Sequence, residues 1–177
     1  AETAERIQVQ RQLFVKRIES VLVDIGEDLL GFKPGIDIAV DWDSSSSLLD
    51  ILRNHREEDV HAGYTRQGIH RADIRFLAEK RPLASVCSRG QSKLFLILLL
   101  ISQATVTESI TGEKPLYLFD DYTAEIDGVT RKIIVDLLIQ QETQAFITTA
   151  EPGPENMDFS SVKMFHVKHG ELIKVVE

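Results

Sequence analysis

The second half of the chain alternates short apolar strands with helices. Residues 116–119 and 145–149 are apolar segments of strand length, and residues 128–141 between them repeat apolar side chains at helical spacing. Parallel strands need such a crossover connection, and they are buried on both faces. The order therefore predicts the α/β class, with a mostly parallel sheet and flanking helices.

Other segments predict further helices and strands. Residues 94–106 are apolar nearly all round, which predicts a core helix. Residues 36–42 and 72–78 alternate apolar and polar side chains, as half-exposed strands do. The remaining expected elements are a helix over residues 48–58, a turn over residues 79–82, and a terminal hairpin of residues 162–167 and 172–176 around His169 and Gly170.

Residues 4–30 predict one long amphipathic helix. Phe14, Ile18, Val21, Ile25 and Leu29 recur at spacings of three and four, which is also typical of a coiled coil. This helix either packs on a domain or ends a helical arm. We expect an arm over residues 1–33 and a body over residues 34–177.

Composition limits the classes of function. With 43% hydrophobic and 27% charged residues, the 177-residue chain is an ordinary globular sequence long enough for a core. The net charge of −8 argues against broad electrostatic binding of nucleic acid. A single cysteine, Cys87, excludes an internal disulfide and favours a reducing, cytoplasmic setting. No apolar run approaches the roughly 20 residues of a membrane span, so we expect no membrane partner.

The first segment with chemical potential is Ser88-Arg89-Gly90-Gln91, directly before the apolar helix. The N-terminus of a helix presents backbone N–H groups and a positive dipole end, which suit a phosphate. Ser88 would add a hydroxyl, and Gly90 would allow a close backbone approach. The alternative is a helix cap with no ligand.

The second segment is Asp120-Asp121, at the end of the strand over residues 116–119. Open α/β sheets bind ligands at the carboxyl ends of their strands. Asp120 is suited to Mg²⁺, and Asp121 to an attacking water. A polar turn is the simpler reading. A nuclease or phosphatase centre would need further acids, for which Asp37 and Asp41 are the obvious candidates.

The third segment is residues 124–127, just before a helix. Asp127 is placed either to cap that helix or to face the nucleotide of a neighbouring subunit.

Together these segments resemble the ATP-binding-cassette ATPases. Residues 88–91 are similar to the signature motif, residues 116–121 to Walker B, and residues 124–127 to the D-loop. The likeness is closer to the RecF family of DNA repair proteins, which shares the Ser-Arg-Gly-Gln-x-Lys signature and the double aspartate. Residues 68–73 resemble that family's Gly-Pro-His-Arg-Ala-Asp, with Ile69 in place of proline.

Two departures from the family pattern affect function. The switch position reads Thr148-Thr149-Ala150, without the histidine of transporter-type cassettes. No Gly-x-x-x-x-Gly-Lys-Ser/Thr occurs, so the P-loop that holds the β- and γ-phosphates is missing. The sequence therefore resembles the C-terminal lobe of a cassette ATPase head that follows an arm helix, and we expect a longer parent.

The resemblance implies roles for these residues. Asp120 would hold Mg²⁺ and Asp121 would orient the hydrolytic water, while Asp127 would couple two sites. The signature residues Ser88, Arg89, Gly90 and Gln91 would meet ATP bound to the opposite subunit, and Thr148 and Thr149 would form the switch.

The resemblance also implies partners. They are the missing P-loop portion, a second copy in an ATP-dependent homodimer, DNA at single-strand/double-strand junctions, and RecR and RecO. Without the P-loop we expect the chain alone to be inactive as an ATPase. The competing interpretations are an SMC-like C-terminal head, a metal-dependent nuclease or phosphatase, and an interaction module that dimerises through residues 4–30.

Overall fold

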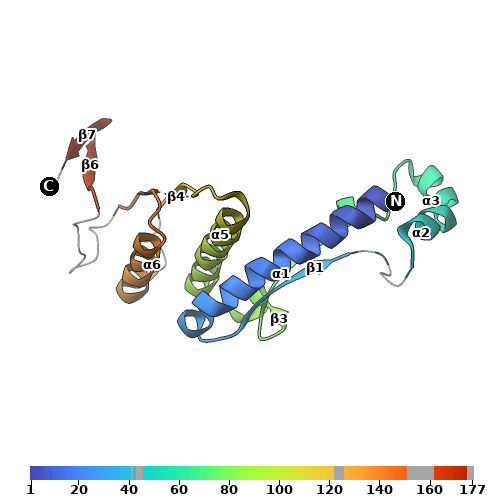
Figure 1. Cartoon of the computed structure of the whole chain (residues 1–177), viewed down its shortest axis with the longest axis horizontal. Coiled ribbons are helices and arrows are strands. Elements are labelled where there is room, and N and C mark those ends of the chain that lie inside the picture. The colour runs from blue at the N-terminus through green and yellow to red at the C-terminus, as the bar shows by residue number, and fades with distance from the viewer. Residues whose placement is uncertain (41, 43–45, 122–125, 151–161, 175–177) are drawn as a thin grey trace. The chain divides into compact units, whose positions relative to one another are not determined.

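The computed structural model describes residues 1–40, 42, 46–121, 126–150 and 162–174, and the chain divides into two compact units (Figure 1). The units are Ala1–Glu113 and Lys114–Glu177. The long helix packs within the first unit, so this division differs from the arm-and-body division at residue 33.

The predicted long helix is α1, Glu2–Leu30, which ends at Gly31 in the left-handed conformation (φ 72°). Besides Gln8, its buried positions are Ile18, Leu22, Gly26 and Leu30, which follow one another every four residues. This face packs against α5 (Arg89–Thr111) and β1 (Pro34–Ala39). A Cβ atom at Gly26 would lie 3.3 Å from Cδ1 of Leu98, so the glycine allows α1 and α5 to approach closely.

The core of the first unit is centred on α5, as its apolar sequence predicts. Phe95, Leu98 and Ile101 are almost completely buried, and the Phe95 ring lies 5.5 Å from that of Phe76. By length and composition α5 also passes the test for a membrane span. Its buried side chains and its packing on α1 are those of a core helix.

The sheet of the first unit is antiparallel, with the order β1-β2-β3. Strand β2 is Asp73–Ala78 and β3 is Arg81–Pro82, and the expected turn between them has Glu79 and Lys80 at φ 49° and 67°. We expected a mostly parallel sheet, and for this unit that is wrong. Alternation of apolar and exposed positions is typical of antiparallel sheets, whereas buried parallel strands read as apolar runs.

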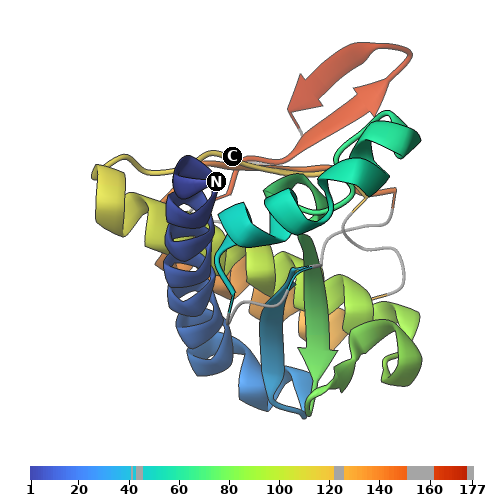
Figure 2. The ribbon, with the colours of Figure 1, turned by 90° about the vertical axis from the view of Figure 1, so that its right-hand side faces the viewer.

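Between β1 and β2 the chain forms two short helices, α2 (Leu48–Asn54) and α3 (Arg56–Ala62), and the 3₁₀ turn η1 (Ile69–Arg71). The single helix expected over residues 48–58 is broken at His55, where the carbonyl of Ile51 accepts both the backbone N–H and Nδ1 of His55. The N-terminal half of α1 lies beside α2 (Figure 2). Glu5 accepts the N–H of Leu48 at 2.8 Å, and Arg11 donates to the Ile69 carbonyl at 3.2 Å.

The second unit contains the predicted strand–helix–strand. Strands β4 (Tyr117–Phe119) and β5 (Ala145–Ile147) are parallel, with Leu118 opposite Phe146, and α6 (Gly128–Gln140) connects them. The expected terminal hairpin is β6 (Phe165–Lys168) and β7 (Glu171–Lys174), which turns through His169 and Gly170 at φ 52° and 82°.

Candidate functional site

The predicted signature segment forms the start of α5. Ser88 is the N-cap residue, and its Oγ accepts the N–H of Gln91 at 3.2 Å. In return, Oε1 of Gln91 accepts the N–H of Ser88 at 3.0 Å. These reciprocal bonds make a capping box, so the capping interpretation of this segment is confirmed in the structure.

The cap leaves this helix end open to a ligand. Ser88, Arg89 and Gln91 are exposed, and Gly90 is half-buried. Within the capping box Oγ of Ser88 only accepts, and a hydroxyl can donate a hydrogen bond as well. The first N–H groups of any α-helix also lack an intrahelical carbonyl. This end of α5 therefore has the geometry to receive an anion such as a phosphate.

Cys87 precedes the cap. Burial raises the pKa of its thiol, so the neutral form is favoured near pH 7. The residue is therefore not an activated nucleophile.

Asp120 and Asp121 follow β4 directly, at its carboxyl end, and both side chains are exposed. Asp121 has φ 46°, in the left-handed region that aspartate tolerates better than most residues. The chain therefore turns sharply at the second acid.

Thr148, the first switch residue, lies against both acids. Its hydroxyl donates to Oδ1 of Asp120 and accepts the backbone N–H of Asp121 at 2.9 Å. Its own N–H donates to the carbonyl of Phe119 at 2.9 Å, which extends the pairing of β5 with β4. The sequence placed Thr148 in a switch but gave no signal for this bridge. Thr149 is exposed one residue further on.

These carboxylates fit a hard divalent cation by their chemistry. They are exposed, they meet at a strand end, and oxygen ligands of this type suit Mg²⁺. Within the described ranges no group of three or more histidine, cysteine, aspartate or glutamate side chains is gathered to hold a metal. Of the acids that a nuclease centre would add, Asp37 lies on β1 opposite Arg75 in the first unit, and Asp41 is outside the described residues.

Asp127 caps α6, as one of its two interpretations predicts. Its Oδ1 accepts the N–H groups of Val129 and Thr130 at 3.1 and 3.0 Å, and its Oδ2 accepts the Thr130 hydroxyl at 2.8 Å. These hydrogen bonds, above all those from Thr130, lower the pKa of Asp127. Of the other D-loop positions, 124 and 125 lie outside the described residues.

The segment that resembles Gly-Pro-His-Arg-Ala-Asp forms a tight turn at η1. Because a carbonyl only accepts, the 3.0 Å contact between Nε2 of His70 and the Thr65 carbonyl places a proton on Nε2. Gly68 has φ 143°, and a Cβ atom there would lie 3.1 Å from Nδ1 of His70. His70 thus stabilises this turn, and the requirement for glycine at position 68 is structural.

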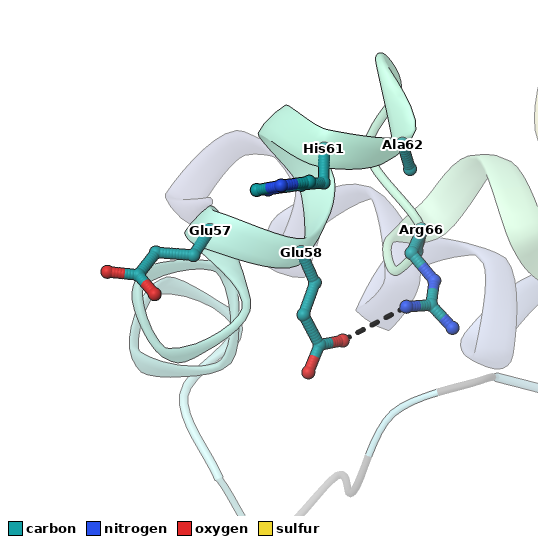
Figure 3. Close-up of a pocket in the computed structure, with 5 residues that line it drawn as sticks. All are labelled: Glu57, Glu58, His61, Ala62 and Arg66. Atoms are coloured by element: carbon teal, nitrogen blue, oxygen red, sulfur yellow. Dashed lines mark hydrogen bonds and ion pairs between the residues drawn. The ribbon is translucent and has the colours of Figure 1, made fainter.

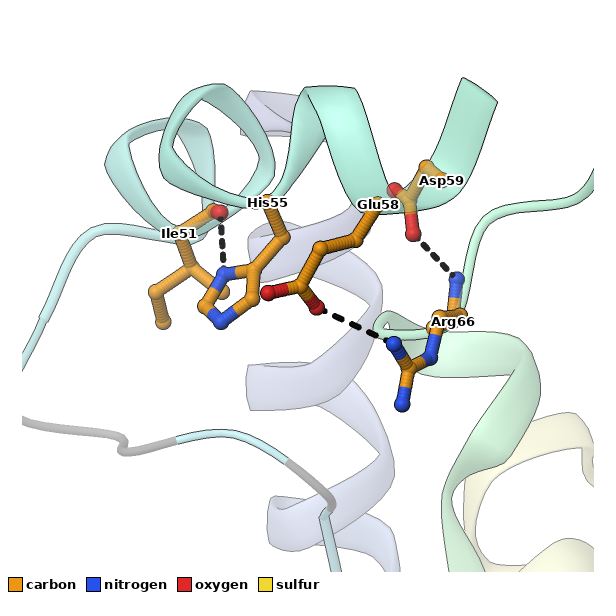
Figure 4. A network of polar contacts seen from close by, with 5 residues as sticks. All are labelled: Ile51, His55, Glu58, Asp59 and Arg66. Atoms are coloured by element: carbon orange, nitrogen blue, oxygen red, sulfur yellow. Dashed lines mark hydrogen bonds and ion pairs between the residues drawn. The ribbon is translucent and has the colours of Figure 1, made fainter. Parts of the chain in front are cut away.

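A surface hollow of 550 Å³ lies beside α3 (Figure 3). Arg66 crosses its edge and pairs with Glu58 at 3.0 Å, while its N–H donates to Asp59 at 3.0 Å (Figure 4). Exposed ion pairs of this type contribute little stability, and the pair offsets only one of the two acids that line the hollow. The lining residues are Glu57, Glu58, His61, Ala62 and Arg66, none of which the sequence motifs identify.

Comparison with curated proteins gives relatives along nearly the whole chain, although no family model matches it. The chain is 38% identical over 167 residues to the DNA replication and repair protein RecF of Marinobacter nauticus, covering 91% of this chain and 44% of the relative. It is 32% identical over 174 residues to RecF of Vibrio parahaemolyticus, covering 97% and 48%. The chain thus spans about half the length of the curated relatives it matches.

Two solved structures share the fold. The recombination mediator protein RecF with ATPrS has a TM-score of 0.72 at 21% identity, over 98% of this chain and 47% of that one. A structure from work on ATP-driven dimerization of SMC ATPases has a TM-score of 0.52 at 15% identity, over 96% and 89%. The expectation of an ATP-binding-cassette head lobe is therefore confirmed as a fold.

Proposed function

Because the chain belongs to the RecF family and corresponds to the C-terminal part of its members, we propose that it forms the C-terminal half of an ATP-dependent DNA-binding protein. That parent acts in DNA replication and recombinational repair. The observation that carries the proposal is the arrangement at the end of β4, where Thr148 joins the predicted Walker B acids Asp120 and Asp121.

In this proposal the start of α5 receives the γ-phosphate of ATP held by a second copy. The Ser88 hydroxyl donates a hydrogen bond to the phosphate, and Gly90 allows the phosphate to approach the backbone. Gln91 keeps the cap in place. Arg89, exposed on the first turn, adds positive charge. Such preorganised donors stabilise phosphate charge, so the nucleotide completes an interface between two heads.

Asp120 and Asp121 would have different roles at the nucleotide of their own subunit. The exposed carboxylate of Asp120 would hold Mg²⁺, which neutralises phosphate charge when it is bound. Asp121 would accept a hydrogen bond from the attacking water and so orient it. Thr149, next to the bridging threonine, belongs to the same switch in this proposal.

Asp127 would couple the two sites indirectly. Its carboxylate already accepts three hydrogen bonds at the start of α6, and a carboxylate repels a phosphate. We therefore assign Asp127 to fixing the position of α6 next to the interface.

Tight ATP binding requires the remainder of the parent, in which the P-loop would lie. On the β4–β5 sheet of the second unit apolar side chains are left uncovered: Leu118 and Phe146 are 72% and 53% exposed, and parallel strands are normally covered on both faces. Further partners in this proposal are a second copy, DNA junctions, RecR and RecO, in the cytoplasm. The candidate DNA contacts are the exposed basic residues Arg71, Arg75, Lys80, Arg81 and Arg89.

Calorimetry of ATP and Mg²⁺ binding tests the proposal, on the chain alone and with the N-terminal half supplied. The chain alone should give no heat, and the reconstituted protein should bind. Asp120→Ala should weaken Mg²⁺-dependent binding by roughly tenfold or more, and Asp121→Asn should retain binding but lose turnover. Asp136→Asn is the matched control, because Asp136 is a half-exposed acid on α6 that pairs with Lys132. Turnover by the chain alone would contradict the proposal.

A further inference from the structure

The hydroxyl of Thr148 makes two contacts of opposite sense. It donates to a side-chain oxygen of Asp120 and accepts the main-chain N–H of Asp121. One hydroxyl can do both, because it carries one proton and two lone pairs. The residue therefore acts on the side chain of the first acid and on the backbone of the second.

The contact with Asp120 fixes the direction of its carboxylate. The proton of Thr148 occupies Oδ1 and restrains rotation of the group, so that Oδ2 points away from the threonine. A carboxylate held through one oxygen is a pre-oriented ligand through the other. Partners of this kind, which contact a ligand and not the metal, commonly determine metal affinity.

The contact with Asp121 stabilises an unfavourable backbone. Asp121 has φ 46°, a conformation that costs free energy in a residue with a side chain. The hydrogen bond from its N–H to Thr148 offsets this cost and determines where the Asp121 side chain leaves the sheet.

We propose that Thr148 is a positioning residue that orients both aspartates for Mg²⁺ and water. This inference rests on the proposed ATPase function and adds a role that the switch prediction did not contain. The hydroxyl, and not the shape of threonine, is the feature that matters.

The chain supplies a matched control at the other end of the same strand pair. Thr143 precedes β5, and its hydroxyl donates to the carbonyl of Pro115, which precedes β4. Thr143→Val removes a hydroxyl that ties the same two segments together, away from the acids. A purely structural role of Thr148 would give the two valine variants the same phenotype.

The first measurement is amide hydrogen exchange at Asp121, by NMR on this chain. Thr148→Val should raise the exchange rate of the Asp121 N–H roughly tenfold or more, whereas Thr148→Ser and Thr143→Val should leave it within about twofold. Thr148→Ala is a second variant without the hydroxyl should the valine not fold. An unchanged Asp121 rate in both would overturn the inference.

The second measurement is the Mg²⁺ concentration for half-maximal ATP hydrolysis by the full-length parent. Thr148→Val should raise it about 10–100-fold, and Thr148→Ser should restore it. Absence of Mg²⁺-dependent hydrolysis in the wild type would refute the proposed function itself. An active wild type with an unchanged valine variant would refute only the role of Thr148.

Discussion

Ser88 and Gln91 cap each other at the start of α5, each accepting the backbone N–H of the other at 3.2 and 3.0 Å respectively. The residues proposed to meet ATP are thus also the residues that begin the core helix. The same atoms therefore serve helix stability and the proposed recognition of ATP. A change of charge at Gln91 should affect recognition and leave stability unchanged.

Gln91→Glu should leave the fold intact and weaken ATP-driven dimerisation of the parent. Glutamate serves in a capping box as well as glutamine and suits the positive end of the helix dipole, so thermal stability should not fall. A second negative charge beside the γ-phosphate should weaken dimerisation at least about tenfold, which sedimentation with ATP measures. Gln103→Glu adds the same charge at an exposed site further along α5 and should have no effect.

The second unit should lose stability in acid, because protonation of the Asp127 carboxylate removes its contribution. Its pKa is lowered in the folded state, so its contribution is complete above the unfolded pKa of about 3.9 and is lost as pH falls through the lower folded value. Asp127→Asn should keep the cap without this pH dependence, and Asp127→Ala should cost about 1 kcal/mol at neutral pH. Urea unfolding at pH 5 and at pH 3 measures both effects. Equal losses in wild type and Asp127→Asn would count against the role of the carboxylate.

Gly68→Ala should destabilise the first unit by about 1–3 kcal/mol, since φ 143° with ψ 174° is a region used almost only by glycine. The new methyl would also press on the His70 ring, at 3.1 Å from Nδ1. Gly63→Ala is the control: Gly63 has φ 77° and nothing within 4 Å of its added Cβ, so its cost should stay near 1 kcal/mol. Chemical denaturation compares the two, and equal costs would contradict the predicted clash.

The chain alone should self-associate through the apolar face of the terminal hairpin. Val167 and Leu172 are paired across the strands and are 66% and 72% exposed. Replacing both with threonine keeps β-propensity and should weaken association at least about tenfold, because apolar burial drives it. Replacing Lys168 and Glu171, the next pair, with threonine is the control on the opposite face and should leave association unchanged. Sedimentation equilibrium would show a monomer at all concentrations if the prediction is wrong.

The sequence predicts those helices and strands whose formation follows from the periodic pattern of apolar residues. The stripe in residues 4–30 became α1, the apolar run became the core of α5, and the strand–helix–strand became β4, α6 and β5. It does not predict strand pairing in the first unit, because the residues that pair with β1 lie 34 to 44 positions further along the chain. At His55 the helix is interrupted by a backbone at φ −99° and ψ 8°, and Nδ1 of His55 contacts the Ile51 carbonyl there; periodicity gives no signal for either.

In the site, too, some features are predicted from the sequence and others depend on tertiary contacts. The motifs identify Ser88, Asp120 and Asp127 by type and order, and the structure places each at the start of a helix or the end of a strand. The bridge from Thr148 to the two acids joins positions 27 and 28 residues apart, so it emerges only when β5 pairs with β4.

Because α1 and α5 cross closely at Gly26, a change in the tilt of α5 would be transmitted to α1. The helix that begins at the signature residues is the one on which α1 rests, and α1 extends roughly 36 Å from Gly26 to Glu2 at 1.5 Å per residue. If α5 tilts by about 5° and α1 follows as a rigid rod, Glu2 moves by roughly 3 Å. The hydrogen bonds of Glu5 with Leu48 and of Arg11 with Ile69 would pass that displacement on to the segment between β1 and β2.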